Sequence, residues 1–194
     1  VADEKIQNFY TEKYGVVHPT KAGLKIPEIF DAAINKEVKA VWIIGEDVVQ
    51  TDPNSAHVAK AMNSLDLLVV QEIFMSETAK HADVILPGTT FLEKDGTFTN
   101  TERRVQRVNR AVEPLPGTKP DGVIVTEMMQ KLGYNQPIYD ADQVLAEIAD
   151  VVPFFKGITR ERLGKLGLQW PVKEDGTDTK ILHQKEFKIG KGRL

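Results

Sequence analysis

Cysteine is absent from the 194-residue chain, and its absence removes several kinds of chemistry at once. Within this chain there can be no disulfide, no thiolate metal site, no thiolate-bound iron–sulfur cluster and no cysteine nucleophile. The chain has four histidines, and they are His18, His57, His81 and His183. Because they are scattered along the sequence, they predict no zinc motif.

Long apolar runs and a charge excess of either sign are also lacking. No apolar run approaches the roughly 18 residues that a membrane-spanning helix needs. The 25 Lys and Arg residues nearly balance the 28 Asp and Glu residues, whereas a nucleic-acid-binding domain is usually basic. Hydrophobic residues make up 41% and charged residues 27%, which is typical of a globular chain and excludes a disordered one. We expect neither a membrane span nor a nucleic-acid partner.

Neither end of the sequence has the features of a complete protein. The chain starts at Val1 with no charged-then-apolar signal segment, and it stops in the polar run Lys188–Leu194. A mature or trimmed product could start this way, whereas a piece of a longer protein would explain both ends. We expect a cytoplasmic location.

Three short apolar runs dominate the centre of the chain. They are Ala40–Ile44, Leu67–Val70 and Val84–Leu86, and helical patterns at Pro53–Leu65 and Ser76–His81 separate them. Fully apolar strands that alternate with helices are typical of a parallel sheet covered on both faces. The sequence therefore predicts an α/β fold, a Rossmann-like parallel sheet with helices on both faces in three αβα layers.

Further helices are predicted before and after this centre. Asp52 is the expected N-cap of the helix that begins at Pro53. In the helix predicted at Pro120–Leu132, the side chains expected to face inward are those of Val123, Ile124, Met128, Met129 and Leu132. The other predicted helices are Ala2–Tyr14, Ile26–Ile34, Pro120–Leu132, Asp142–Val152 and Thr159–Leu166.

Regular structure is hard to place from Gly88 to Pro120, where only Arg104–Val108 reads as a strand. A loop of this length is usually functional or packs on other domains. Four of its apolar residues are expected to face parts of a longer protein, namely Phe91, Phe98, Val105 and Val108. The clustered Arg103, Arg104, Arg107 and Arg110 fit either a solvated strand face or a surface for an anionic partner. From Pro171 onward the polar sequence predicts a linker.

Ligands of open α/β sheets bind beyond the carboxyl ends of the strands. Asp47 and Glu72 follow two of the predicted strands, 25 residues apart, and an acid near this spacing binds ribose hydroxyls in dinucleotide folds. Ser76 opens a helix whose free N–H groups could take a phosphate. The loop Gly45–Gln50 is not G-x-G-x-x-G, however, so solvated loop acids remain an equal alternative.

Four segments resemble the molybdopterin-dependent oxidoreductases, and among these most closely the formate dehydrogenase large (alpha) subunit. They are Val41–Asp47, Val69–Ala79, Ala82–Pro87 and Glu93–Gln106. The block from Ala82 to Gln106 is the most specific, and the resemblance extends from about Ile6 to Leu194.

The resemblance implies a cofactor that these residues alone do not. Members of this family are long chains of four domains that bind two molybdopterin guanine dinucleotides around one molybdenum or tungsten, usually beside a [4Fe–4S] cluster. This chain resembles the third domain. Residues 1–150 would form the Rossmann-like dinucleotide-binding domain, and 151–194 a helical extension and linker toward a C-terminal cap domain. The partners would be the other domains and an electron-accepting subunit or carrier, and the isolated fragment would not oxidise formate.

The resemblance also assigns binding residues by matching position, and it assigns no catalytic or metal-binding residue. Asp47 matches a dinucleotide contact after the first strand, and the pair Gln71 and Glu72 matches nucleotide contacts after the second. Ser76 matches a residue near the phosphates, and Gly88 a small residue after the Leu-Pro turn. Asp121 matches the acid that hydrogen-bonds guanine, since a carboxylate accepts from both N1–H and the 2-amino group.

Three alternatives stay open at this point. The chain could come from another molybdopterin enzyme such as an assimilatory nitrate reductase. It could be a non-catalytic homologue, like the large peripheral subunit of respiratory complex I, that kept the fold without the pterin. It could also be a simple α/β interaction module, which explains the fold but not the polar residues at the strand ends.

Overall fold

The chain folds into two compact units. The computed structural model describes residues 3–184, 186–187 and 190. The units are Val1–Ile85 and Leu86–Leu194. The predicted boundary after residue 150 concerns where a cofactor-binding domain ends, and it stays a prediction.

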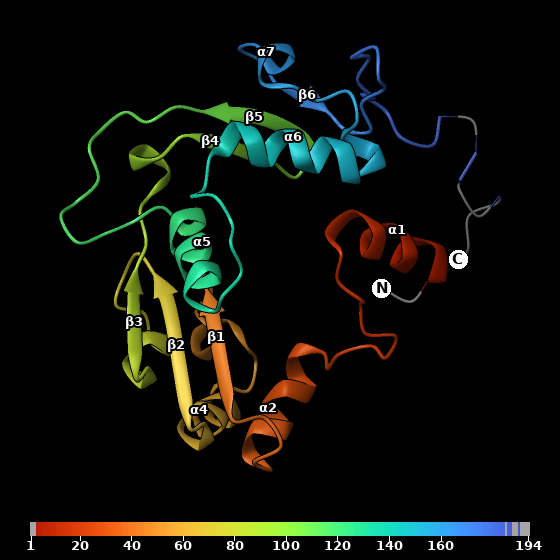
Figure 1. The fold of residues 1–194 in the computed structure, drawn as a ribbon. Helices are drawn as coiled ribbons and strands as arrows, with labels where there is room; N and C mark the ends of the chain where they lie inside the picture. The colour runs from red at the N-terminus through yellow and green to blue at the C-terminus, as the bar shows by residue number, and fades with distance from the viewer. Residues whose placement is uncertain (1–2, 185, 188–189, 191–194) are drawn as a thin grey trace. The chain divides into compact units, whose positions relative to one another are not determined.

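A parallel sheet forms the centre of the first unit. Its strands are β1 (Ala40–Ile44), β2 (Leu67–Glu72) and β3 (Val84–Pro87), in the order β1-β2-β3. All three point the same way (Figure 1). β1 pairs with β2 from Ala40 opposite Leu67 to Ile44 opposite Gln71. The predicted α/β fold and its parallel sheet are confirmed, because the continuous Val, Leu and Ile runs form its strands.

Two helices of the first unit cover one face of this sheet. α2 (Ile26–Ile34) has Pro27 in its first turn, and α4 (Ser55–Ser64) brings small residues close to the strands. The shared core consists of Phe30, Ala33, Ile43, Val58, Ala61, Met62, Leu68, Val70 and Ala79. α1 (Glu4–Tyr14) precedes them, with Asp3 as its N-cap, and it buries none of its residues.

Local structure after β1 and β2 differs from the prediction. A short helix α3 (Val48–Thr51) fills the loop after β1, and Asn54 rather than Asp52 caps α4 by accepting from the backbone N–H of His57. Asp52 instead accepts from the N–H of Asn54 at 2.8 Å, in a turn. The helix predicted from Ser76 is the single 3₁₀ turn η1 (Thr78–His81).

The second unit combines an antiparallel sheet with helices. The sheet has the order β4 (Gly96–Thr99), β5 (Arg104–Val108) and β6 (Leu168–Gln169). Its core contains Val105, Leu145, Ile158, Leu163 and Val172. The helices are α5 (Asp121–Lys131), α6 (Ala141–Val151) and α7 (Arg160–Leu163), with 3₁₀ turns η2 (Phe91–Glu93) and η3 (Pro153–Phe155).

Two predictions about the second unit were wrong. Val105 is buried in the core just described rather than facing outward, although Phe91 and Phe98 are half exposed. Leu132 is 80% exposed because it follows the last turn of α5. The linker expected from Pro171 onward stays a prediction, because Val172 is 2% exposed but residues 173–184 form no helix or strand.

The described helices are all too short or too polar to cross a bilayer.

Candidate functional site

Asp47 lies at the carboxyl end of β1, where it binds the segment that follows β2. Its Oδ1 accepts from the backbone N–H and the hydroxyl of Thr78, at 2.9 and 2.6 Å. Its Oδ2 accepts from the N–H of Glu77 at 3.1 Å. The Thr78 hydroxyl oxygen in turn accepts from the N–H of Val49 at 3.0 Å. The carboxylate therefore ties two strand-end loops together.

These contacts change the acidity of Asp47. Burial alone would raise its pKa, but the hydroxyl and backbone N–H of Thr78 and the N–H of Glu77 together hold the pKa below the ordinary value. The carboxylate is thus ionised in its loop-binding role.

The other predicted residues of the first unit differ in accessibility. Gln71 is fully buried at the end of β2. Glu72 is partly exposed, and its Oε1 accepts from the N–H of Ile73 at 2.7 Å. The Ser76 hydroxyl oxygen accepts from the N–H of Ala79 at 3.1 Å, just before the η1 turn. The strand ends thus bring these residues to one edge of the sheet, as predicted, but η1 is too short to offer a helix N-terminus.

Gly88 belongs to the second unit and follows β3 directly. It is buried and forms an isolated parallel bridge with Lys119, whose N–H donates to the carbonyl of Pro87 at 3.1 Å. This pairing brings the residues after β3 beside the segment that leads into α5.

Asp121 is the first residue of α5, and Lys94 binds it. The Lys94 ammonium donates to Asp121 Oδ2 and, at 3.1 Å, to the carbonyl oxygen of Thr89. Lys94 therefore joins three stretches that are separate in sequence. Sequence reasoning did not select Lys94, although it lies in the most specific block of the resemblance.

A pocket of about 200 Å³ opens beside this ion pair. Pockets that take a drug-sized ligand are usually larger, so this one suits a single ring system. The Gly122 backbone lies against Tyr139, since a Cβ at Gly122 would fall 2.3 Å from the ring. Burial, and then the charges of Asp140, Asp121 and Asp142, raise the pKa of Tyr139, so its hydroxyl stays protonated. The pocket is lined by Lys94, Asp95, Gly96, Thr97, Phe98, Val108, Pro120, Asp121, Gly122 and Tyr139.

Glu93 fixes the backbone next to Lys94. Its carboxylate accepts from the N–H and hydroxyl of Thr90, at 2.8 and 2.9 Å, and from the N–H of Leu115 at 2.8 Å. The N–H groups of Thr90 and Leu115, with the Thr90 hydroxyl, lower the pKa of Glu93. The long loop that looked irregular in sequence is thus held by a buried carboxylate.

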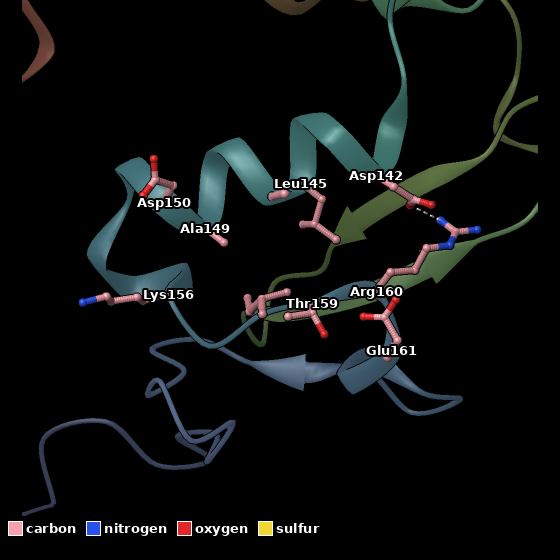
Figure 2. A pocket seen from close by; sticks show the side chains of 10 residues that line it. Asp142, Leu145, Ala149, Asp150, Lys156, Thr159, Arg160 and Glu161 are labelled. Atoms are coloured by element: carbon pink, nitrogen blue, oxygen red, sulfur yellow. Dashed lines mark hydrogen bonds and ion pairs between the residues drawn. The ribbon is translucent and has the colours of Figure 1, made fainter. Parts of the chain in front are cut away.

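A second pocket in this unit has a different character. It measures about 470 Å³ and lies between α6 and residues 156–161 (Figure 2). Leu145 and Ile158 form its apolar floor, and the Asp142–Arg160 ion pair, at 2.8 Å, stands at one end. None of the six predicted binding residues lines it.

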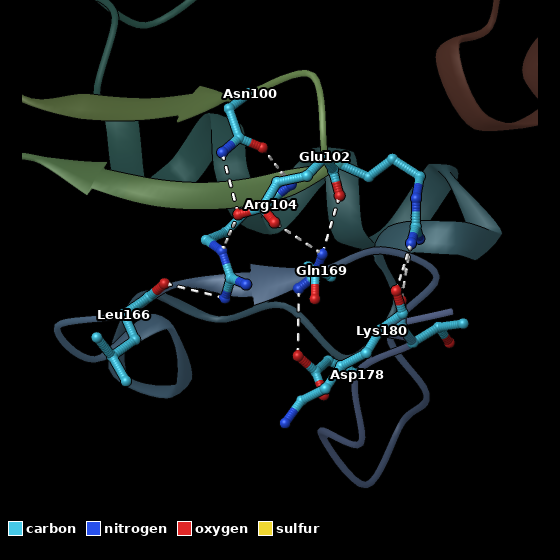
Figure 3. A network of polar contacts seen from close by, with 9 residues as sticks. Asn100, Glu102, Arg104, Leu166, Gln169, Asp178 and Lys180 are labelled. Carbon is cyan, nitrogen blue, oxygen red and sulfur yellow. Dashed lines mark hydrogen bonds and ion pairs between the residues drawn. The ribbon is translucent and has the colours of Figure 1, made fainter. Parts of the chain in front are cut away.

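Two residues of the arginine cluster have internal roles. Arg104 pairs with Glu102 at 2.6 Å and donates to the Leu166 carbonyl at 3.3 Å (Figure 3). Arg103 donates to the carbonyls of Trp170, Thr179 and Lys180. Arg103 and Arg104 thus bind groups within the chain, which weakens the interpretation of the cluster as a surface for an anionic partner.

The part of the chain that the structure describes contains no group of three or more His, Asp or Glu side chains suited to a metal ion. The smaller pocket is lined by the carboxylates of Asp95 and Asp121, the Lys94 ammonium, the Thr97 hydroxyl and two aromatic rings. This set suits an organic ring with hydrogen-bonding edges.

Comparison with known proteins identifies relatives along most of the sequence. Residues 11–131 match the family described as Molybdopterin oxidoreductase. The F420-dependent formate dehydrogenase subunit alpha of Methanocaldococcus jannaschii is 46% identical over 89% of this chain and 26% of its own length. The probable oxidoreductase YjgC of Bacillus subtilis is 40% identical over the whole chain and 20% of its own length. The chain thus spans about a fifth to a quarter of these relatives.

A solved structure shares the fold. Acetylene hydratase from Pelobacter acetylenicus superposes with a TM-score of 0.60 over 80% of this chain and 22% of its own, at 23% sequence identity. At this identity the likeness concerns the fold alone. The family match is the stronger finding, because residues 11–131 include the ends of β1 and β2 and Asp121. The chain belongs to the molybdopterin oxidoreductase family.

Proposed function

We propose that this chain is part of the catalytic subunit of a formate dehydrogenase and binds the nucleotide end of a molybdopterin guanine dinucleotide. The parent enzyme would oxidise formate to carbon dioxide and pass two electrons to a partner subunit or carrier. Two relatives support the parent reaction. One is named as an F420-dependent formate dehydrogenase subunit alpha, at 46% identity, and the other as a putative formate dehydrogenase, at 39%. The predicted cytoplasmic location belongs to the same proposal.

The observation that carries the cofactor proposal is Asp121 in the wall of the small pocket. A carboxylate there can accept from guanine N1–H and the 2-amino group, a pair that adenine lacks. Phe98 and Tyr139 offer aromatic surface to the base. The donor and acceptor set therefore fits the guanine end of the cofactor.

The strand-end residues have separate parts in this proposal. Glu72 and Ser76 would contact the ribose and phosphates, with Gly88 giving the backbone room near the turn. Gln71 would contribute from its buried position. Asp47 would hold the loops after β1 and β2 together by its hydrogen bonds to Thr78 and Glu77. Its contact with the cofactor would then be less direct than the resemblance implies.

The cofactor would supply the redox chemistry when bound, through molybdenum or tungsten, with a [4Fe–4S] cluster carrying electrons onward. We propose that the ligands of the metal and the cluster lie in other parts of a longer polypeptide. The residues of this chain would bind and orient the nucleotide end, and the isolated chain would not oxidise formate.

The complete polypeptide is the protein to test. We expect this polypeptide to oxidise formate and to release guanine nucleotide from its cofactor on acid treatment. Replacing Asp121 by Ala should lower cofactor occupancy, whereas replacing the exposed Glu12 by Ala should not. Activity with nitrate but not formate would favour the nitrate reductase alternative, and a purified protein without pterin would favour the non-catalytic one.

A further inference from the structure

An open, largely apolar groove of about 330 Å³ lies in the first unit, between α2 and the loop that follows β1. Its apolar lining comes from Ile26, Phe30, Val48 and Pro53. Phe30 is 5% exposed and belongs to the core, whereas Ile26 is 63% exposed. A small ligand is usually buried by roughly 70% or more in its pocket, so an open groove with an exposed edge suits a side chain of another polypeptide segment better.

Two carboxylates also line this groove, and each uses one oxygen within the chain. Glu46 Oε1 accepts from the hydroxyl of Thr51 at 2.7 Å, and Asp52 Oδ1 accepts from the N–H of Asn54 at 2.8 Å. Neither carboxylate forms an ion pair with a Lys, Arg or His that the structure describes, including Lys25 beside the groove. The second oxygen of each carboxylate is therefore available to a cation from outside.

The apolar lining and the two negative charges together define the occupant. Water is released when Ile26 is covered by an apolar side chain. The like charges of Glu46 and Asp52 favour a cation at the same place. An arginine or lysine meets both conditions when an apolar residue stands next to it, because its own stem packs on apolar surface while its charged end binds carboxylate oxygens.

The lengths of the relatives indicate the source of such a segment. The chain spans 26% of the Methanocaldococcus jannaschii formate dehydrogenase subunit and 20% of YjgC. Glu46 directly precedes Asp47, at the edge of the sheet where the proposed cofactor binds. Under the proposed function, the parts of the polypeptide that hold the rest of the cofactor approach this same edge. A segment of the same polypeptide is therefore the occupant that lies nearest.

We propose that this groove docks a segment of the same polypeptide, outside residues 1–194, that carries an arginine or lysine next to an apolar side chain. The inference goes beyond the proposed function and rests on it only for the longer polypeptide. Glu46 and Asp52 then select the segment, because one without a cation would cover both carboxylates and leave them unpaired.

Photo-crosslinking in the complete polypeptide identifies the occupant. The substitution Ile26→p-benzoylphenylalanine places the probe at an exposed position of the groove, and mass spectrometry maps the residue that it joins. The expected product joins position 26 to a segment of the same polypeptide outside residues 1–194, with an arginine or lysine beside the crosslinked residue.

A second measurement tests the two charges. Glu46→Gln combined with Asp52→Asn removes both charges but keeps a carbonyl oxygen to accept from Thr51 and from Asn54. Without the charges the segment should leave the groove more often, and the amides of α3 should exchange their hydrogens about tenfold faster. The matched control is Glu37→Gln, because Glu37 is an exposed acid of the same unit outside the groove, and it should leave this exchange unchanged.

Three results would overturn the inference. A crosslink to a separate subunit or to a second copy of this chain would show a different occupant, and absence of any crosslink would show that nothing covers the groove. Equal exchange of the α3 amides in the unaltered polypeptide and the doubly substituted one would remove the role of the charges. Formate oxidation and pterin content, measured on the same preparations, report separately on the proposed function.

Discussion

Asp47 and Thr78 are bonded twice, because Asp47 Oδ1 accepts from both the backbone N–H and the hydroxyl of Thr78. The two residues follow different strands of the parallel sheet, so the pair fixes the shape of the edge where ligands of such folds bind. An acid selected as a cofactor contact therefore has a structural role that sequence spacing could not reveal.

Loss of this pair should destabilise the fold. Thr78→Val removes the hydroxyl that donates to Asp47 and accepts from Val49, and it should lower the free energy of unfolding by about 1–3 kcal/mol. Thr78→Ser keeps both bonds and should cost less. Urea denaturation followed by circular dichroism measures both, and equal stability of the two variants would contradict the role of the hydroxyl.

Acid should weaken the fold through Asp47 and Glu93. Both pKa values lie below the ordinary 3.8 and 4.5, so the unfolded chain takes up protons first as the pH falls. The stabilisation is complete above these ordinary values and is lost as the pH drops through the folded pKa values. Glu93→Gln should flatten the fall of stability with acid, measured by urea titrations from pH 6 to about pH 2.

The strands were predictable because a buried parallel strand requires a continuous apolar run, and Ala40–Ile44 and Leu67–Val70 have little else. The N-cap of α4 could not be predicted in the same way. Asp52-Pro53 has the residue types of a helix start, but the chain makes a further turn there and the helix begins only after Asn54. β4 was missed because Gly96–Thr99 has no apolar alternation of its own and depends on pairing with β5.

Side-chain pairs distant in sequence were beyond prediction for the same physical reason. Asp121 was selected by resemblance, but its partner Lys94 lies 27 residues earlier and meets it only after folding. Val105 was expected, like Val108, to face parts of a longer protein, yet on β5 it is buried in the core of the second unit. Position on a strand, rather than composition, decides burial here.

A methyl group at Gly122 should disrupt the pocket wall. The added Cβ would fall 2.3 Å from Tyr139 Cδ2, so Gly122→Ala should destabilise the chain by about 1–3 kcal/mol despite the better helix propensity of alanine. The same substitution in a Tyr139→Ala background should cost less, which a double-mutant cycle measures. Gly23→Ala, where nothing lies within 4 Å of the new Cβ, is the control.

Arg103 should hold the segment after β6. Its guanidinium donates to the carbonyls of Thr179 and Lys180 at 3.0 and 3.2 Å, and it lies 5.7 Å from the Trp170 ring centroid. Arg103→Ala should speed amide hydrogen exchange in residues 170–180 by roughly tenfold or more, since about 1–3 kcal/mol of local stability is lost. Arg107→Ala removes a contact with Asn109 and the charge near Glu161, and it should leave exchange in residues 170–180 unchanged.

The central claim is that this chain recognises guanine through Asp121, and calorimetry with GDP and ADP tests it most directly. The account predicts weak binding, of millimolar order, with GDP preferred in the unaltered chain and the preference abolished in Asp121→Asn. Equal binding of GDP and ADP that the substitution leaves unchanged would contradict it and remove Asp121 from the site.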